Sequence, residues 1–186
     1  MMSSLTTKKA IAYTFKDLLK EKPFNKITVN DISNQCNINR QTFYYHFTDI
    51  IDLVEWICIV DAEKALKDNK TYATWQEGFL SVFELMKADE KFINNIYHNV
   101  SLEILITYLY KLVYPLIYNV VEEKAKGLLV KEEDKVFIAN FYKSAFVALV
   151  IEWIKKGMKE EPRDIIKHLS ILIEGTIDHS LRNLNK

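Results

Sequence analysis

Apolar residues recur every three or four positions along most of the chain, which is the spacing of one helical face. Ile11, Phe15 and Leu18 predict a first helix that begins near Thr6 or Thr7 and ends before Pro23. The same periodicity, with its polar interruptions, predicts further helices at about 29–36, 39–47, 48–67, 72–86, 90–99, 102–126, 132–156 and 162–184.

The second and third of these helices are separated by a very short connection. Asn37 suits the left-handed backbone of a tight turn, and Ile38 can fill the space beneath it. Two short helices joined in this way form a helix-turn-helix. In the third helix, Phe43 and Phe47 share the inner side. The outward set comprises Arg40, Gln41, Thr42, Tyr44, Tyr45 and His46.

This outward set contains donors, acceptors and flat rings, and no acid. Arginine pairs with guanine and glutamine with adenine, while hydroxyl and imidazole groups suit phosphate oxygens. The pattern therefore predicts contact with DNA. The alternative interpretation is that Tyr44, Tyr45 and His46 are ordinary half-buried packing residues.

Composition supports a helical fold. Of 186 residues, 49% are apolar and only 4 are Gly and 3 Pro, so the chain can form a core and has few helix breakers. We expect an all-α protein. Pro115 is expected to kink or split its helix. Cys36 and Cys58 fit free thiols, with a disulfide or sensor pair as the alternative.

The sequence shows no segment typical of secretion or of a membrane span. The N-terminus has no apolar signal core, and the apolar run 144–151 is too short to span a membrane, so we expect a cytoplasmic chain without membrane contact.

Formal net charge is zero, yet residues 1–47 hold seven Lys or Arg and three acids, a net charge of +4. This asymmetry is typical of a basic head that meets a polyanion.

The run KITVNDISNQCNINRQTFYYHFTDIIDLV, residues 26–54, resembles the DNA-binding segment of tetracycline-repressor-like (TetR/AcrR) regulators. Ser33 replaces an alanine of the family pattern, and Ile50 stands where the family usually has a lysine that supports phosphate binding. Matching positions are Thr28, Ile32, Ile38, Thr42, Phe43, Tyr44, His46 and Phe47. Within the family, RQTFYYHF followed by VEWI is most similar to regulators of dihydroxyacetone kinase operons.

The resemblance implies a helix-turn-helix DNA-binding domain at residues 1–50 and a helical regulatory and dimerisation domain at 51–186. It also implies two sets of contacts with double-stranded DNA. The base-edge candidates are Asn30, Arg40, Gln41 and Tyr45. The phosphate candidates are Lys8, Lys9, Thr28, Thr42, Tyr44 and His46.

The C-terminal half carries candidates for an effector pocket and a dimer interface. An apolar site with a few hydroxyl groups could bind a small molecule. Its candidates are Tyr97, His98, Tyr108, Tyr114, Phe141 and Tyr142. Apolar and small residues on the last helices could form a four-helix bundle with a second copy. Its candidates are Ala145, Ala148, Leu169, Leu172, Ile173 and Ile177. Plain core packing is the alternative for both sets.

The leading functional hypothesis is a regulator that binds a palindromic operator as a homodimer and acts as a repressor released by an effector. The alternative within the family is an activator controlled by a partner protein. A helical interaction protein that does not bind DNA is a further alternative. A helical enzyme is disfavoured, because the four histidines lack metal-ligand spacing and no Gly-rich phosphate loop is present. We expect no catalytic residue, metal or cofactor.

Overall fold

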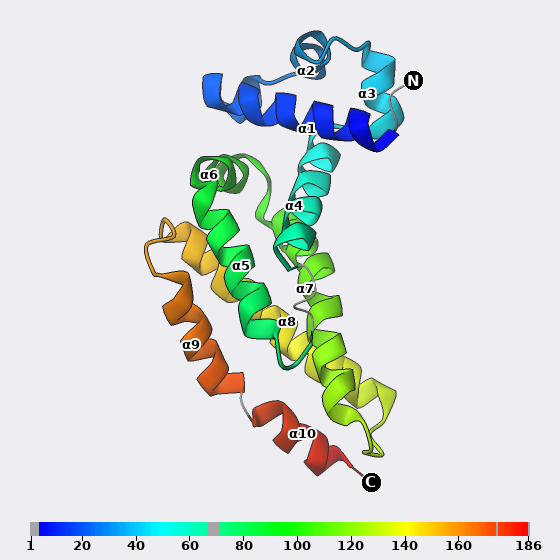
Figure 1. Ribbon diagram of the computed structural model, residues 1–186, viewed down its shortest axis with the longest axis vertical. Coiled ribbons are helices and arrows are strands. Elements are labelled where there is room, and N and C mark those ends of the chain that lie inside the picture. Colours follow the sequence, from blue (N-terminus) through cyan, green and yellow to red (C-terminus); the bar gives the residue numbers. More distant parts are fainter. Residues whose placement is uncertain (1–3, 67–70, 174, 186) are drawn as a thin grey trace. The chain divides into compact units, whose positions relative to one another are not determined.

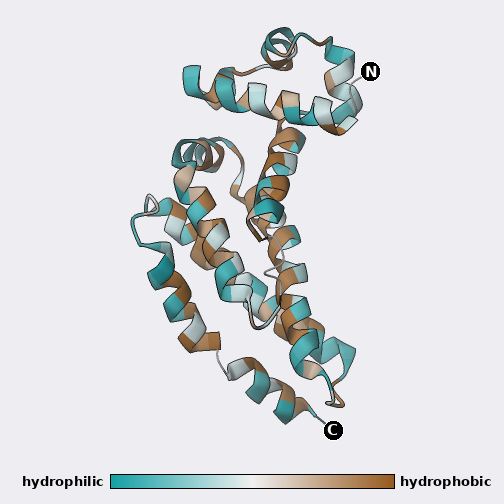
Figure 2. Cartoon of the chain, in the orientation of Figure 1, coloured by the Kyte–Doolittle hydropathy of each residue, from teal (hydrophilic) through white to brown (hydrophobic). Residues whose placement is uncertain are grey.

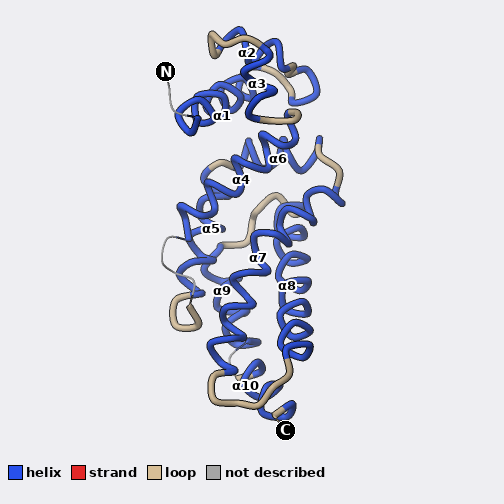
Figure 3. The backbone as a smooth tube through the Cα atoms, turned by 90° about the vertical axis from the view of Figure 1, so that its right-hand side faces the viewer, coloured by secondary structure: helices blue, strands red, loops and turns tan. Residues whose placement is uncertain are grey.

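The computed structural model describes residues 4–66, 71–173 and 175–185, and within them every regular element is a helix (Figures 1 and 3). This confirms the all-α prediction. Two compact units are present. The first comprises residues up to Asp61 together with Lys91–Leu102, and the second comprises Ala62–Glu90 and the chain from Glu103 onward. The predicted domain boundary at residue 50 falls at the start of a helix, whereas the compact units divide within that helix.

The first unit, called the head, contains the expected helix-turn-helix. Phe15, Phe43 and Phe47 are fully buried together with Ile11 and Ile32. The first helix packs against the two short helices that follow it. The helices of the head are α1 (Ser4–Glu21), the 3-10 helix η1 (Phe24–Lys26), α2 (Val29–Gln35), α3 (Arg40–His46), most of α4 (Ile50–Leu66), and α6 (Glu90–Asn99) apart from its first residue.

Local chemistry explains both short helices. Thr28 and Asp31 form a reciprocal capping box at the start of α2, in which each side chain accepts from the other residue's backbone N–H. Asn37 has φ of 53°, the left-handed conformation predicted for the turn. Asn39 then caps α3, because its side chain accepts from the backbone N–H of Thr42 at 2.7 Å.

The second unit, called the body, is a layered helical bundle. Helix α5 packs along α9, and α10 contacts α8 and α9. Aromatic rings fill its centre: Phe79 lies 4.2 Å from Phe146, and Phe83 lies 4.9 Å from Trp153, between ring centroids. Its helices are α5 (Trp75–Ala88), α7 (Leu102–Ala125), α8 (Glu132–Lys155), α9 (Pro162–Ile173) and α10 (Thr176–Leu184). Figure 2 shows apolar and polar residues alternating around α9.

One sequence prediction about the body is wrong. The single helix expected at 162–184 is two helices, α9 and α10, because Gly175 adopts φ of 79° between them. Of the two effects expected of Pro115, a split does not occur, because α7 is one helix from Leu102 to Ala125; a kink stays a prediction. The predicted end of the fourth helix, Lys67, lies outside the described residues.

Helices α7 and α8 are long and apolar enough to cross a membrane, judged by length and composition alone. The expectation of no membrane contact rested on the short apolar run 144–151 and did not anticipate either helix. Core helices of proteins that never enter a membrane meet the same criterion, so the observation is weak evidence.

Candidate nucleic-acid interface

The predicted base-reading residues all lie on the exposed surface of the head. Arg40, Gln41 and Tyr45 project from α3, and Asn30 lies on α2. The Tyr45 side chain is 82% exposed, although a tyrosine ring usually contributes to packing. Since Phe43 on the same helix is fully buried, α3 separates its apolar anchor from its polar, ring-bearing outer face.

The predicted phosphate contacts vary in exposure. Lys9, Thr28 and Tyr44 are exposed, and Tyr44 is 51% accessible. Lys8, Thr42 and His46 are half-buried. The Thr42 hydroxyl donates to the Asn39 side chain at 2.9 Å, so this hydroxyl helps to hold the start of α3.

Thr28 is engaged in holding α2. Its hydroxyl donates to the Asp31 carboxylate at 2.7 Å and also accepts from the Asp31 backbone N–H at 3.2 Å. Lys22 pairs with the other carboxylate oxygen at 2.9 Å. Hydrogen bonds from Lys22 and then Thr28 lower the pKa of Asp31 to about 2. The acid in the helix-turn-helix is therefore ionised and neutralised by Lys22, which limits its repulsion of a polyanion.

Lys8 lies against aromatic rings. Its ammonium is 5.1 Å from the centre of the Phe47 ring and 5.7 Å from that of Trp56, within cation–π range. His46 is close to this cation. Partial burial, followed by the Lys8 charge, lowers the pKa of His46 below its ordinary value of 6.5. Both effects favour the neutral form of the His46 ring before any anion approaches.

The start of α4 shows a feature that the sequence analysis missed. Asp49 accepts from the backbone N–H of Asp52 at 2.8 Å, and Asp52 accepts from the backbone N–H of Thr48 at 2.8 Å. Two carboxylates therefore occupy the helix start beside Ile50, the position at which the family resemblance implies a phosphate-supporting lysine. The spacing Thr48-Asp49-x-x-Asp52 is a capping pattern that could have identified this arrangement.

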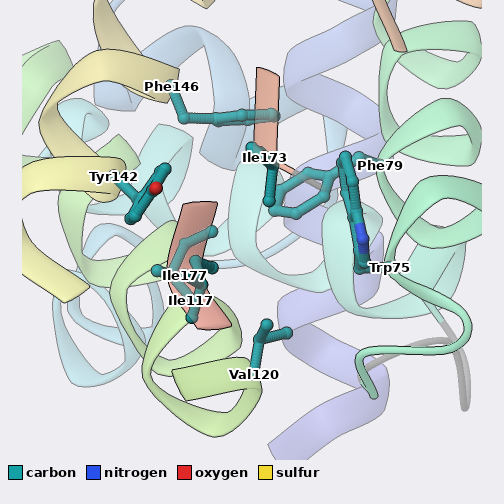
Figure 4. Close-up of a pocket in the computed structure, with 8 residues that line it drawn as sticks. All are labelled: Trp75, Phe79, Ile117, Val120, Tyr142, Phe146, Ile173 and Ile177. Atoms are coloured by element: carbon teal, nitrogen blue, oxygen red, sulfur yellow. The ribbon is translucent and has the colours of Figure 1, made fainter. Parts of the chain in front are cut away.

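The body contains a small apolar cavity (Figure 4). The volume open to the centre of a water-sized sphere is about 10 Å³, roughly the room for one water molecule. Its one hydroxyl-bearing residue, Tyr142, shares a hydrogen bond of 2.6 Å with Thr176. The lining residues are Trp75, Phe79, Ile117, Val120, Tyr142, Phe146, Ile173 and Ile177.

The six predicted pocket residues do not converge on this cavity. Tyr142 alone among them lines it. Tyr97 and His98 belong to α6 of the head, and Phe141 is 62% exposed. Tyr108 and Tyr114 are half-buried on α7.

The six predicted interface residues divide into two groups. Ala145, Ala148 and Leu172 are exposed, and Leu172 is 67% accessible. Leu169, Ile173 and Ile177 are buried inside the protomer. Other large apolar side chains also remain exposed on α8 and α9, namely Phe137, Phe141, Leu149 and Ile171.

Comparison with known proteins agrees with this geometry. Residues 16–57 match "Bacterial regulatory proteins, tetR family", and residues 73–175 match "Transcriptional regulator C-terminal region". The chain is 30% identical over 160 residues to the HTH-type dhaKLM operon transcriptional activator DhaS of Lactococcus lactis subsp. lactis strain IL1403, with 84% of each chain covered.

Solved structures share the fold. A dihydroxyacetone kinase operon activator DhaS has a TM-score of 0.70 at 23% identity, covering 98% of this chain and 99% of the other. A TetR transcriptional regulator from Streptococcus agalactiae 2603V has a TM-score of 0.58 at 21% identity, with 98% and 96% covered. From the matched segments and the helix-turn-helix geometry together, the chain belongs to the tetR family of bacterial regulatory proteins and is a transcriptional regulator.

Proposed function

We propose that this regulator reads base edges with the outer face of α3, through Arg40, Gln41 and Tyr45, assisted by Asn30 of α2. The observation that supports this most strongly is the division of α3. Its phenylalanine is buried in the head, whereas its exposed face presents only donors, acceptors and rings. Such groups match the pattern of donors, acceptors and thymine methyl groups in the major groove.

Phosphate contact is assigned to Lys9, Tyr44 and His46. The exposed Lys9 adds positive charge, while Lys8 chiefly packs on the Phe47 and Trp56 rings. Thr28 and Thr42 act mainly by fixing the starts of α2 and α3. Two carboxylates at the start of α4 disfavour a phosphate there, so the chain depends more on the other contacts.

The active species is a homodimer on a palindromic operator. Support comes from the apolar side chains left exposed on α8 and α9: Phe137 is 73% accessible and Phe141 is 62% accessible. Phe137 and Phe141 are four positions apart on α8, so they lie on one face of that helix, and exposed apolar residues that gather in this way mark protein interfaces. Phe141→Glu together with Leu172→Glu should convert the dimer to a monomer in sedimentation velocity, with helical content retained. A monomeric wild type would contradict the proposal.

We further propose activation of transcription under the control of a partner protein. The printed name of the 30%-identical relative, an operon activator, supports activation. This cavity has room for about one water molecule, so it does not itself hold a small-molecule effector in this conformation. Release of a repressor by a small effector is the competing hypothesis.

The first experiment is selection of random duplex DNA by the full chain, followed by sequencing. An enriched inverted repeat is expected, because two heads related by a two-fold axis read two half-sites. A reporter promoter carrying that repeat then distinguishes the two modes: expression should rise with the regulator present, and a fall would establish repression. An unenriched pool would contradict sequence-specific reading by the unaccompanied protein.

Single variants can distinguish residues that read bases from residues that contact phosphates. Arg40→Ala or Gln41→Ala should cost about 1–3 kcal/mol of binding and relax preference at one base position. Lys9→Ala should weaken binding to all sequences alike and reduce its salt dependence. Lys20→Ala is the control on the same helix, because Lys20 pairs with Asp17 at 2.7 Å. Equal effects of the Arg40 and Lys9 variants on preference would contradict this division of roles.

A further inference from the structure

One lysine of the head, Lys16 on α1, contacts two other helices of the head. The ammonium of Lys16 on α1 pairs with Asp61 of α4 at 2.9 Å, and it also lies 4.5 Å from the centre of the Phe92 ring on α6. All three residues lie within the head. We call these residues the Lys16 junction.

The position of the junction along the chain is informative. The chain passes between head and body at three places, which are 61/62, 90/91 and 102/103. Asp61 is the last residue of the head before the chain enters the body at 61/62. Phe92 is the second residue of the head after the chain returns from the body at 90/91. Lys16 therefore contacts the chain beside two of the three covalent connections through which the body can act on the head.

Helix α1 also contacts the two helices that carry the proposed base-reading residues. Helix α1 packs against α2 and α3, which carry the residues assigned to base contact. Phe15, the neighbour of Lys16, is fully buried in the head core. A displacement of α4 or α6 at the junction would thus reach α1, and through it the helix-turn-helix.

We propose that Lys16 is a positioning residue for regulation, which couples the α4 and α6 connections to α1 so that a change in the body shifts the reading helices. This inference rests on the proposed DNA-binding function. The chemistry suits such a role, because one ammonium satisfies a carboxylate and a ring face simultaneously. Both members of the ion pair remain partly accessible, at 26% and 30%, so the contact can open and re-form.

The experiment is hydrogen exchange by mass spectrometry on the full chain, free and bound to the selected operator. The test variant is Lys16→Met, which keeps an apolar stem and removes the charge. Lys20→Met, which removes one positive charge from the same helix, is the matched control. Asp61→Asn is a second variant that breaks the ion pair and leaves the ammonium over Phe92.

In the free protein, Lys16→Met should increase exchange in residues 91–99 by roughly five- to thirtyfold, the combined effect of a partly accessible ion pair and a cation–π contact. Asp61→Asn should give a smaller increase. In the wild type, operator binding should protect α6 as well as α2 and α3. In Lys16→Met the protection of α2 and α3 should persist while that of α6 is lost.

The outcomes separate the two proposals. No protection of α2 and α3 in the wild type would overturn the proposed DNA contact, whatever α6 does. Protection of α6 that is unchanged by Lys16→Met would overturn the coupling role and leave the DNA contact intact. Equal acceleration throughout the head would also overturn it, since it would mean that Lys16 only stabilises the fold.

Discussion

Replacement of Ser33 by alanine should stabilise the head. Ser33 lies on α2, its side chain is only 1% exposed, and its Oγ has no hydrogen-bond partner. A buried polar group without a partner costs about 1–3 kcal/mol, and this cost disappears when the hydroxyl is removed. Loss of one atom leaves a cavity penalty of about 24 cal/mol per Å³, well below 1 kcal/mol in total. Alanine also favours a helix by a few tenths of a kcal/mol over serine.

We therefore expect Ser33→Ala to raise the free energy of unfolding of the head by about 1–3 kcal/mol. Urea unfolding followed by far-UV circular dichroism measures the global effect. Hydrogen exchange of residues 29–38 measures the local effect, which should be a slowing of exchange in α2. For a chain of this size, each 1 kcal/mol corresponds to about 2–4 °C in Tm.

The control is Ser170→Ala on α9. The Ser170 hydroxyl donates to the Ile166 carbonyl at 2.9 Å, so its removal should be neutral or cost up to about 1 kcal/mol. Destabilisation by Ser33→Ala would refute the reasoning, because it would mean that the Ser33 hydroxyl has a partner in solution, such as the carbonyl of Val29 one turn earlier.

Four further predictions follow from local contacts. Asn39→Ala should cost about 1 kcal/mol by removing the α3 cap, measured by urea unfolding. Gly175→Ala should destabilise the body by about 1–2 kcal/mol, because φ is 79° there; an unchanged Tm would contradict this. The Asp31 carboxylate, with its pKa lowered to about 2, should stabilise the head above pH about 4, and this should be lost as pH falls toward 2; Asp31→Asn should flatten that dependence in unfolding midpoints. Since the pKa of free His46 is lowered and a phosphate would raise it, DNA affinity should increase as pH falls from 8 to 6, and His46→Gln should abolish the increase in fluorescence anisotropy titrations.

The helix-turn-helix could be predicted because its determinants are local. The cap at Thr28, the left-handed turn at Asn37 and the buried Phe43 are each readable within a few residues. The break at Gly175 was missed because the apolar spacing continues from Ile173 to Ile177, so periodicity alone predicts one helix.

The remaining features depend on contacts between distant parts of the chain. Lys16 and Asp61, which form an ion pair, are 45 positions apart, and no residue pattern in either helix predicts this pair. The residues that line the cavity could not be predicted either, because aromatic residues at helical spacing are equally typical of a packed core and of a ligand pocket. The packing of α5 against α9 and of α10 against α8 determines which of them enclose a space.

The placement of the tryptophans gives the protein an intrinsic optical probe. Trp56 lies in the head, with its ring 5.8 Å from that of Phe47 at the end of α3, whereas Trp75 and Trp153 lie in the body. Replacing the two body tryptophans with phenylalanine would leave Trp56, beside the recognition helix, as the single tryptophan of the chain. Fluorescence from that residue would then follow operator engagement in real time without an attached dye.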